Sequence, residues 1–554
     1  GASEGKTAIG RAADSPKVWQ GTNVLQERLM GQRINASTSG CGGCGLNRRS
    51  FLRGCVACAA GGTGLLAASA GPVGAAEARR PRIRLVFSEV PMPQPTWPYT
   101  GFDFEPRKRE VLELLRKGCP KVEFLPVTIQ TPEEAAKVAA DNRGIDGYLL
   151  YFMSLWNTSL MPIPSTGRPT LMADYLFGGS GEFLMTYAKA RRLGHHVSCV
   201  SSSRDSDLVE AARCFEILTK PEGSPAAFVA ACDAVRKRNT KPMGNLACKP
   251  DPVEVGDVSE CLSRLRQATM LILSNDQPAV FENIRRFYGI RTVSRPVEDL
   301  LPLYERADRD EARQIADRWM KEAEKVVEPT RETIEKAARI YLAMRALMKQ
   351  HNADAIGVNC IYANWGAHIP AYVCLGFHQL NNEGFVAVCE ADLLCAPTML
   401  IMRYLVDRPG FVSDPVIDTA TNRIIYAHCV APSRVFGPKG PANPYRIRTN
   451  AEPRAGSTAQ SIMPLGYMTT TVEFNTCRKD FAKEVLLHQG KTVAHDETDR
   501  ACRNKLAVEV KGDIEKLLYE WDEWSWHRVT FYGDLKEPVK ELAKALKMTV
   551  VEEA

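Results

Sequence analysis

The chain of 554 residues is 45% hydrophobic and carries a formal net charge of only +6. At about 100–200 residues per domain, this length predicts three or four domains with sizeable cores. No run of lysine and arginine alternates with aromatic residues, which argues against nucleic-acid binding. The mature part of the chain contains no stretch of about 20 apolar residues, the length that a membrane-spanning helix requires.

The first 78 residues indicate an export signal rather than part of the fold. Residues 47–53, Asn-Arg-Arg-Ser-Phe-Leu-Arg, resemble a twin-arginine motif, and a weakly apolar stretch at 55–70 follows. A small-residue cleavage site at 76–78, Ala-Glu-Ala, completes the expected order. We therefore expect 1–29 to be a non-native extension, 30–78 to be a signal peptide, and the mature protein to be periplasmic. The alternative is a chance basic patch ahead of a buried helix.

Thirteen cysteines follow residue 78, and many of them lie in apolar runs. An oxidising compartment would favour disulfides. The twin-arginine route, however, moves proteins that have already folded in the reducing cytoplasm, where buried thiols stay free. We expect few disulfides.

From residue 81 short apolar runs alternate with amphipathic stretches. This alternation predicts parallel sheets with helices on both faces. In a first α/β domain at 80–168 we expect strands at 83–87, 122–127 and 145–152, and helices at 110–117 and 132–140.

A second doubly wound α/β domain is expected at 169–352. Its predicted strands are 170–173, 196–201 and 269–273, and its predicted helices are 206–218, 279–288, 310–326 and 330–351.

A mixed C-terminal domain is expected at 353–554. Strands at 355–360, 385–389 and 410–413 and a helix at 399–406 would form its α/β part. Beyond residue 424 short alternating strands, among them 467–474 and 505–510, predict an antiparallel part, and 536–547 predicts a final helix.

Two acidic residues, Glu390 and Asp414, each follow a predicted strand of the C-terminal domain. The helical crossover between them predicts that the two strands are parallel and are neighbours, or one strand apart, in one sheet. Both carboxylates would then emerge at its carboxyl edge, where open α/β sheets bind ligands. Two acids held about 5–10 Å apart repel each other unless a cation or a shared proton intervenes, and a divalent metal is the simplest solution. The alternative is that Glu390 caps a helix and Asp414 caps a turn.

Three segments around these residues resemble the C-terminal signature of the L-fucose isomerase and L-arabinose isomerase family. They are Cys-Glu-Ala-Asp at 389–392 with the helix after it, Phe-Val-Ser-Asp-Pro at 411–415, and Trp-His-Arg-Val-Thr-Phe-Tyr-Gly-Asp at 526–534. A fourth, Tyr-Ala-His-Cys at 426–429, is similar to the arabinose isomerase side of the family. The motif match covers roughly 355–430 and 520–550.

The resemblance implies a metal-dependent aldose–ketose isomerase with an enediol intermediate. Glu390 and Asp414 would bind Mn²⁺ and act as acid and base, His527 would be a further ligand, and His428 would join the metal shell. It also implies a small sugar substrate and a homo-oligomer, a trimer or hexamer. The sugar stays open, because the residues after Asp392 are more apolar than in the fucose enzymes. A periplasmic sugar-binding protein or a catalytically degenerate homologue remains the alternative.

Aromatic residues in loops after predicted strands are candidates for stacking on a sugar ring. Trp97, Tyr99 and Trp365 have this position, although ordinary loop packing is the alternative. The run Gly-Gly-Ser-Gly at 178–181 lacks a dinucleotide fingerprint, so a turn is favoured there over a phosphate cradle.

Overall fold

The computed structural model describes residues 79–155, 160–475 and 483–554, and Arg79–Ala554 form one compact unit. The predicted extension and export signal lie outside the described residues. Within the described residues, no helix combines the length and the apolar character that crossing a membrane requires. The twelve cysteines in this part of the chain are all free thiols, as expected from the sequence.

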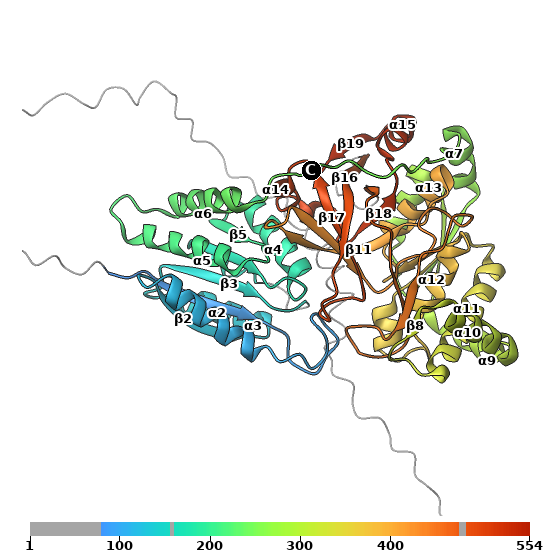
Figure 1. Ribbon diagram of the computed structural model, residues 1–554, viewed down its shortest axis with the longest axis horizontal. Coiled ribbons are helices and arrows are strands. Elements are labelled where there is room, and N and C mark those ends of the chain that lie inside the picture. The colour runs from blue at the N-terminus through green and yellow to red at the C-terminus, as the bar shows by residue number, and fades with distance from the viewer. Residues whose placement is uncertain (1–78, 156–159, 476–482) are drawn as a thin grey trace, which may run out of the picture. The chain divides into compact units, whose positions relative to one another are not determined.

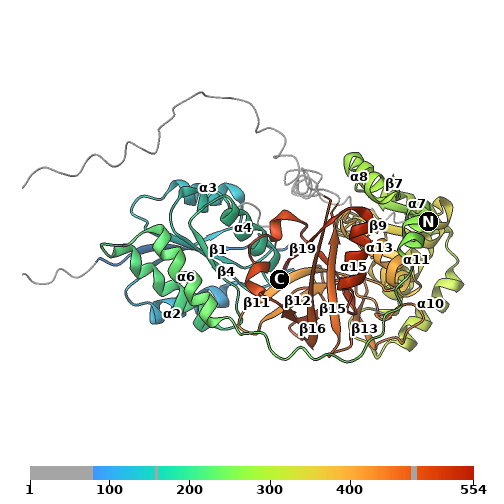
Figure 2. The same cartoon turned by 90° about the horizontal axis from the view of Figure 1, so that it is seen from above.

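The first parallel sheet has five strands in the order β2-β1-β3-β4-β5. They are β1 (Arg82–Ser88), β2 (Glu123–Ile129), β3 (Gly147–Phe152), β4 (Thr170–Asp174) and β5 (Val197–Val200). Helices α3 (Pro132–Ala140) and α4 (Ser180–Arg192) pack on one face, and α2 (Glu105–Gly118), α5 (Asp205–Arg213) and α6 (Pro225–Asn239) pack on the other. Figure 2 shows α3 and α4 on one side of the strands and α2 and α6 on the opposite side. The segment 80–168 supplies three of these strands, and the sheet continues beyond it.

The second parallel sheet has four strands in the order β10-β9-β6-β7. They are β6 (Thr269–Leu273), β7 (Arg291–Arg295), β9 (Ala355–Val358) and β10 (Val386–Cys389). One face carries α9 (Leu300–Arg306), α10 (Arg309–Glu322), α11 (Arg331–His351) and α12 (Cys374–Asn382), and the other carries α7 (Val258–Gln267), α8 (Pro278–Tyr288) and α13 (Cys395–Val406). Two parallel sheets covered by helices on both faces agree with the predicted α/β class, but the strands divide differently from the prediction. The predicted strands 170–173 and 196–201 join the first sheet as β4 and β5. The predicted strands 355–360 and 385–389, which were assigned to the C-terminal domain, join the second sheet as β9 and β10.

Side-chain caps explain where the two long helices of the second sheet begin. Asp308 accepts hydrogen bonds from the N–H groups of Asp310 and Glu311 at the start of α10, and Thr330 accepts one from Thr333 at the start of α11. The predicted helix at 310–326 is too long at its end. Residues 325–326 instead form β8 (Lys325–Val326), which pairs with β13 (Tyr445–Arg448) and, through it, with β14 (Thr458–Ser461).

The third sheet closes on itself, and its pairings are antiparallel except that β19 pairs parallel to β16. Its order is β15-β18-β11-β12-β17-β16-β19, and β15 also pairs with β16, so that the first six strands form a barrel. The strands are β11 (Phe411–Asp418), β12 (Arg423–His428), β15 (Met468–Phe474), β16 (Glu484–His495), β17 (Asn504–Lys511), β18 (Arg528–Tyr532) and β19 (Thr549–Glu552). The barrel strands are drawn in orange and red in Figure 1. The remaining helices are α14 (Ile514–Leu517) and α15 (Lys536–Leu546). The predicted antiparallel part is thus confirmed.

The expectation that the strands before Glu390 and Asp414 are parallel neighbours is wrong. β10 lies at the edge of the second parallel sheet, whereas β11 belongs to the barrel and is antiparallel to both of its neighbours. The physical reason is the connecting helix α13, whose side chains are buried almost all round. A helix of that kind lies between two layers, and it separates the parallel sheet from the barrel.

A buried ionic network fixes the barrel wall beside one of the predicted site residues. Arg528, fully buried at the start of β18, donates hydrogen bonds to Glu473 at 3.1 Å and to Glu553 at 2.8 Å. His488 donates to the other oxygen of Glu553 at 2.8 Å. Separating these side chains would leave a buried charge without a partner, which is costly, so the ion pairs hold the side chains in place. His527 immediately precedes Arg528, so the ion pairs of Arg528 also hold the backbone of His527 in place.

Candidate active site

Glu390 leaves β10 in a rare backbone conformation. Its φ is +58° and that of Ala391 is +49°, so two consecutive non-glycine residues are left-handed. Such residues cost free energy and persist where the surrounding structure holds them, often at functional sites. The Glu390 N–H donates to Cys360 Sγ at 3.4 Å. The carboxylate is about a quarter exposed, and no hydrogen bond to it is found within the described residues.

Asp414 lies inside β11, and the strand register places two histidines beside it. Asp414 pairs with Ala427 on β12, so His428 is one residue further along that strand. On the other side Ser413 pairs with Arg528 on β18, which brings His527 next to Asp414. Beyond Ser413, β11 pairs with β12 but no longer with β18. Pro415 is tolerated at this position because no backbone N–H is needed there to pair with a second strand.

These four residues come together from two different sheets. His527 Nε2 lies 3.5 Å from Asp414 Oδ1 and 3.8 Å from Glu390 Oε2. His428 Nε2 lies 3.8 Å from Glu390 Oε1 and 4.0 Å from Asp414 Oδ2. The two imidazole rings are 5.1 Å apart between centroids. All four predicted metal-binding side chains therefore face one point.

Asp392 orients the His527 ring from behind. The His527 Nδ1–H donates to Asp392 Oδ2 at 3.0 Å, and Ser525 Oγ donates to the same oxygen at 3.2 Å. The other oxygen of Asp392 accepts the backbone N–H groups of Leu394 and Cys395, each at 2.8 Å, at the start of α13. Asp392, and not Glu390, therefore caps this helix. Its carboxylate leaves Nε2 of His527 free of a proton when the ring is neutral.

Asp414 has its own positioning residue, Trp526. The indole Nε1–H donates to Asp414 Oδ1 at 2.6 Å. The first turn of α4 meets this indole at Gly181, where an added Cβ would lie 2.5 Å from Trp526 Cζ2. The glycine-rich run at 178–181 therefore forms a turn, as expected. It also begins helix α4 in close contact with Trp526 and so holds the indole in place.

The site carries strongly shifted acid–base equilibria. Burial raises the pKa of Glu390 to about 7 against the attraction of His527, and the charge of Asp414 adds to the rise. Burial likewise raises the pKa of Asp414 to about 6. For His527 burial acts downward, but Glu390, Asp392 and Asp414 together raise its pKa to about 10. Burial and the nearby His527 lower the pKa of His428. The His527 imidazolium is thus the cation that compensates the two acids when no metal is present.

The donor set fits a divalent metal ion. His527 Nε2 is buried and has no hydrogen-bond partner in the part of the chain that the structure describes, although two carboxylates face it at 3.5–3.8 Å. These separations are too long for hydrogen bonds. They are close to the roughly 3–3.5 Å between ligand atoms that share one ion at about 2.1 Å. Glu390, His428 and His527 can each place one ligand atom within 4.8 Å of the others.

The predicted sugar-stacking aromatics occupy different environments. Trp97 is fully buried and donates its indole N–H to Glu452 at 3.1 Å, so no face of the ring is open to a sugar. Tyr99 lies under the guanidinium of Arg454, 3.9 Å from the ring centroid. Trp365 is half-buried at the end of the turn Ile361–Trp365 that follows β9, on the same sheet edge as Glu390.

Sequence reasoning gave no role to Asp392, Trp526 or Glu452. Asp392 and Trp526 lie inside the quoted motifs, and the signal available for Asp392 was an acid three residues before a helix that lacks another capping side chain. Burial is the main cause of the raised pKa values of Glu390 and Asp414, and the charge of Glu452 adds to both. No local sequence pattern marks Glu452 as part of the site.

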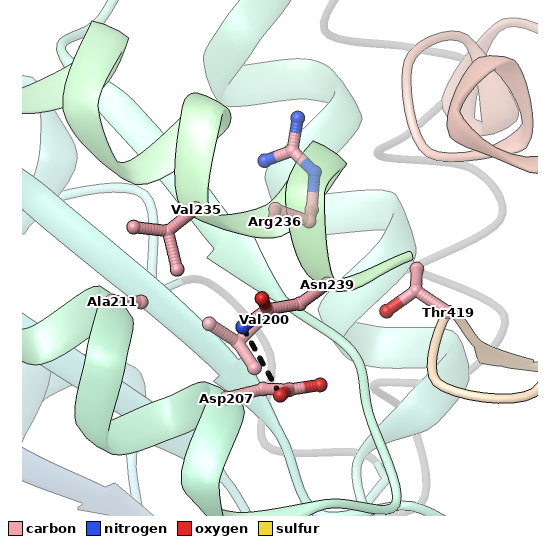
Figure 3. A pocket seen from close by; sticks show the side chains of 7 residues that line it. All are labelled: Val200, Asp207, Ala211, Val235, Arg236, Asn239 and Thr419. Atoms are coloured by element: carbon pink, nitrogen blue, oxygen red, sulfur yellow. Dashed lines mark hydrogen bonds between the residues drawn. The ribbon is translucent and has the colours of Figure 1, made fainter. Parts of the chain in front are cut away.

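The enclosed cavity in Figure 3 is not this site. It lies between α5 and α6 and has a volume of about 10 Å³, room for one water molecule at most. The hydrogen bond from Asn239 Nδ2 to Asp207 Oδ1, 3.2 Å long, crosses it.

The chain is similar to several curated proteins that share one name. A sulfoquinovose isomerase from Clostridium sp. (strain MSTE9) is 26% identical over 218 residues, 38% of this chain and 46% of the relative. The sulfoquinovose isomerase from Alkalicoccus urumqiensis is 22% identical over 342 residues, 57% and 74% of the two chains. That from Priestia aryabhattai is 22% identical over 221 residues, 39% and 48% of the two chains.

The chain thus spans about half the length of the Clostridium and Priestia relatives and about three quarters of the Alkalicoccus one. All these names are of isomerases, in agreement with the enzyme class that the sequence predicts. No family model matches the chain. The structure of Francisella novicida lysine decarboxylase LdcF aligns with a TM-score of 0.16 at 8% identity, over 44% of this chain and 41% of that one, which is too low to carry any argument.

Proposed function

We propose that the protein is a metal-dependent aldose–ketose isomerase whose site is formed by Glu390, Asp414, His428 and His527. The observation that carries the proposal is the buried, unpaired Nε2 of His527 facing two carboxylates, with Asp392 holding the ring in the tautomer that binds metal. A bound divalent ion, for which Mn²⁺ suits the mixed oxygen and imidazole donors, would polarise the sugar carbonyl and stabilise the enediolate.

The two carboxylates differ in freedom, which suggests different roles. Asp414 is nearly buried and one of its oxygens is held by Trp526, so it is suited to holding an ion in place. Glu390 is more exposed and no hydrogen bond restrains its carboxylate within the described residues. We assign to Glu390 the transfer of the proton between C1 and C2 of the open-chain sugar. A positioned acid–base group is worth about 10²–10⁴-fold in rate.

Sulfoquinovose is the first substrate to test, since the curated relatives are named for it. A panel should pair it with uncharged aldoses such as L-fucose and L-arabinose, and ketose formation should be measured for each with and without Mn²⁺. Conversion of any aldose supports the proposal. Binding of a sugar without conversion would favour a binding protein, and neither binding nor conversion would favour a degenerate homologue.

Substitutions at the site test the assignment of residues. Glu390→Gln keeps size but removes basicity, and its activity should fall by about 10²–10⁴-fold even at saturating Mn²⁺. His527→Ala should act mainly on metal affinity, so that excess Mn²⁺ restores part of its activity. Asp207→Asn, which changes a buried acid outside the site, is the matched control. If Glu390→Gln binds metal and converts sugar like the parent, the assignment is wrong.

A further inference from the structure

A second group of potential metal ligands lies beside the site, formed by Cys429, Glu452 and Cys502. The two sulfurs are 3.7 Å apart. Cys502 Sγ lies 3.0 Å from Glu452 Oε1, and Cys429 Sγ lies 3.7 Å from Glu452 Oε2. Cys502 and Glu452 are buried, and Cys429 is half-buried. These three side chains form a compact cluster that the proposed isomerisation does not use.

The spacing is that of atoms around one tetrahedral ion. Two thiolates bound to Zn²⁺ at about 2.3 Å lie about 3.8 Å apart, and a carboxylate oxygen at about 2.0 Å lies about 3.5 Å from each sulfur. The sulfurs lie 3.7 Å apart, close to the first of these values, and they lie 3.0 and 3.7 Å from different oxygens of the Glu452 carboxylate, Oε1 and Oε2. A disulfide, in contrast, requires about 2.05 Å between the sulfurs.

The cluster also has an outer hydrogen bond of the kind that orients metal ligands. Trp97 Nε1, which can only donate, is bonded to Glu452 Oε1 at 3.1 Å. Backbone hydrogen bonds hold the same loop against Glu452, from Thr100 N to Glu452 O at 2.8 Å, and against the residue before Cys502, from Ala501 N to Pro98 O at 2.9 Å. The full burial of Trp97 is thereby explained without a sugar.

We propose that Cys429, Glu452 and Cys502 bind a Zn²⁺ ion, distinct from the ion of the isomerase site. The ion would join three segments that are distant in sequence: the end of β12, the turn between β13 and β14, and the start of β17. Cys429 directly follows His428, so the zinc would also fix the end of the strand that carries this histidine. Water is the natural fourth ligand, since the described residues supply three.

The test is to titrate the metal-free full chain with Co²⁺ and Zn²⁺ under reducing conditions. Cobalt bound to two thiolates gives charge-transfer absorption in the near ultraviolet, which oxygen and imidazole ligands do not give. The band should appear in the parent and persist in His527→Ala, so that failure of the isomerase proposal would not affect it. It should be lost in Cys429→Ala and in Cys502→Ala, and kept in Cys261→Ala, a buried cysteine outside the cluster.

Glu452→Gln guards against variants that do not fold, because it keeps an oxygen for the Trp97 N–H. It should weaken Zn²⁺ binding at least about 10-fold, as measured by competition with a chromogenic chelator. The proposal is overturned if the parent shows no thiolate band, or if the band survives in both cysteine variants. A Cys429–Cys502 disulfide in the freshly purified, unreduced protein would overturn it as well.

Discussion

Replacing Asp392 by Asn should impair metal binding although it substitutes none of the proposed metal ligands. The Asn oxygen would stay with the backbone N–H groups of Leu394 and Cys395, which both bond to one oxygen of Asp392. The amide NH₂ would then replace the oxygen that now accepts from His527 Nδ1 at 3.0 Å. Facing a donor, Nδ1 must accept, so the neutral ring carries its proton on Nε2 and turns an N–H toward Glu390 and Asp414.

The size of the effect follows from that change of tautomer. Loss of an outer carboxylate partner of a metal-binding histidine costs about 10–100-fold in affinity, which is about 1.4–2.7 kcal/mol. Mn²⁺ affinity, measured by calorimetry or by the paramagnetic resonance of free Mn²⁺, should fall by that factor. Activity should return at high Mn²⁺, with kcat near that of the parent.

A second measurement separates positioning from general damage to the fold. The pKa of His527, raised to about 10 partly by the hydrogen bond to Asp392, should drop in Asp392→Asn when followed by NMR in the metal-free protein. Asp207, a buried acid on α5, accepts a hydrogen bond from Ser202 and lies outside the site. Asp207→Asn should therefore change neither the Mn²⁺ affinity nor the pKa of His527. If Asp392→Asn binds Mn²⁺ like the parent and His527 titrates as before, the reasoning about the tautomer is refuted.

Three further results are expected. Because Mn²⁺ must displace the proton of His527, whose pKa is about 10, metal affinity should rise about 10-fold per pH unit between about pH 7 and 10; titrations at several pH values check this, and an unchanged slope in His527→Ala would contradict it. Gly181→Ala should displace Trp526, whose ring lies 2.5 Å from the added Cβ, and cost about 1–3 kcal/mol of stability. Trp526→Phe, which removes the N–H donor together with part of the indole, should match its loss of activity, and full activity in this variant would contradict the positioning role. His378 is buried, and desolvation lowers its pKa to about 4. The neutral ring therefore stabilises the fold fully above the unfolded pKa of about 6.5, and the free energy of unfolding should fall by about 2 kcal/mol between pH 7 and pH 5. If Tm falls as much over this range in His378→Gln as in the parent, another group is responsible.

Much of the architecture follows from local patterns. The alternation of short apolar runs and amphipathic stretches predicts parallel sheets with helices on both faces, and the apolar face of 330–351 predicts α11 almost to the residue. These features depend on neighbours within a few residues, so the sequence carries them directly. The end of α10 was misplaced because β8 forms only by pairing with β13, more than a hundred residues later.

By itself the sequence determined which residue types stand in the site: an acid after a buried strand, a second acid before a proline, and a histidine near the C-terminus. Glu390 and Asp414 were found in this way, whereas His527 and His428 were predicted from the resemblance of their segments to the isomerase family. Their chemistry, hard oxygen and imidazole donors around one point, follows from the side chains alone.

Only the tertiary structure decided how these residues meet. Glu390 comes from the edge of a parallel sheet, whereas Asp414 and the two histidines come from a closed barrel on the other side of α13. Strand pairing across a chain of this length depends on the free energy of burying whole faces, which no short motif records. The same holds for Asp392 behind His527, for Trp526 on Asp414, and for the cysteines and Glu452 that gather beside them.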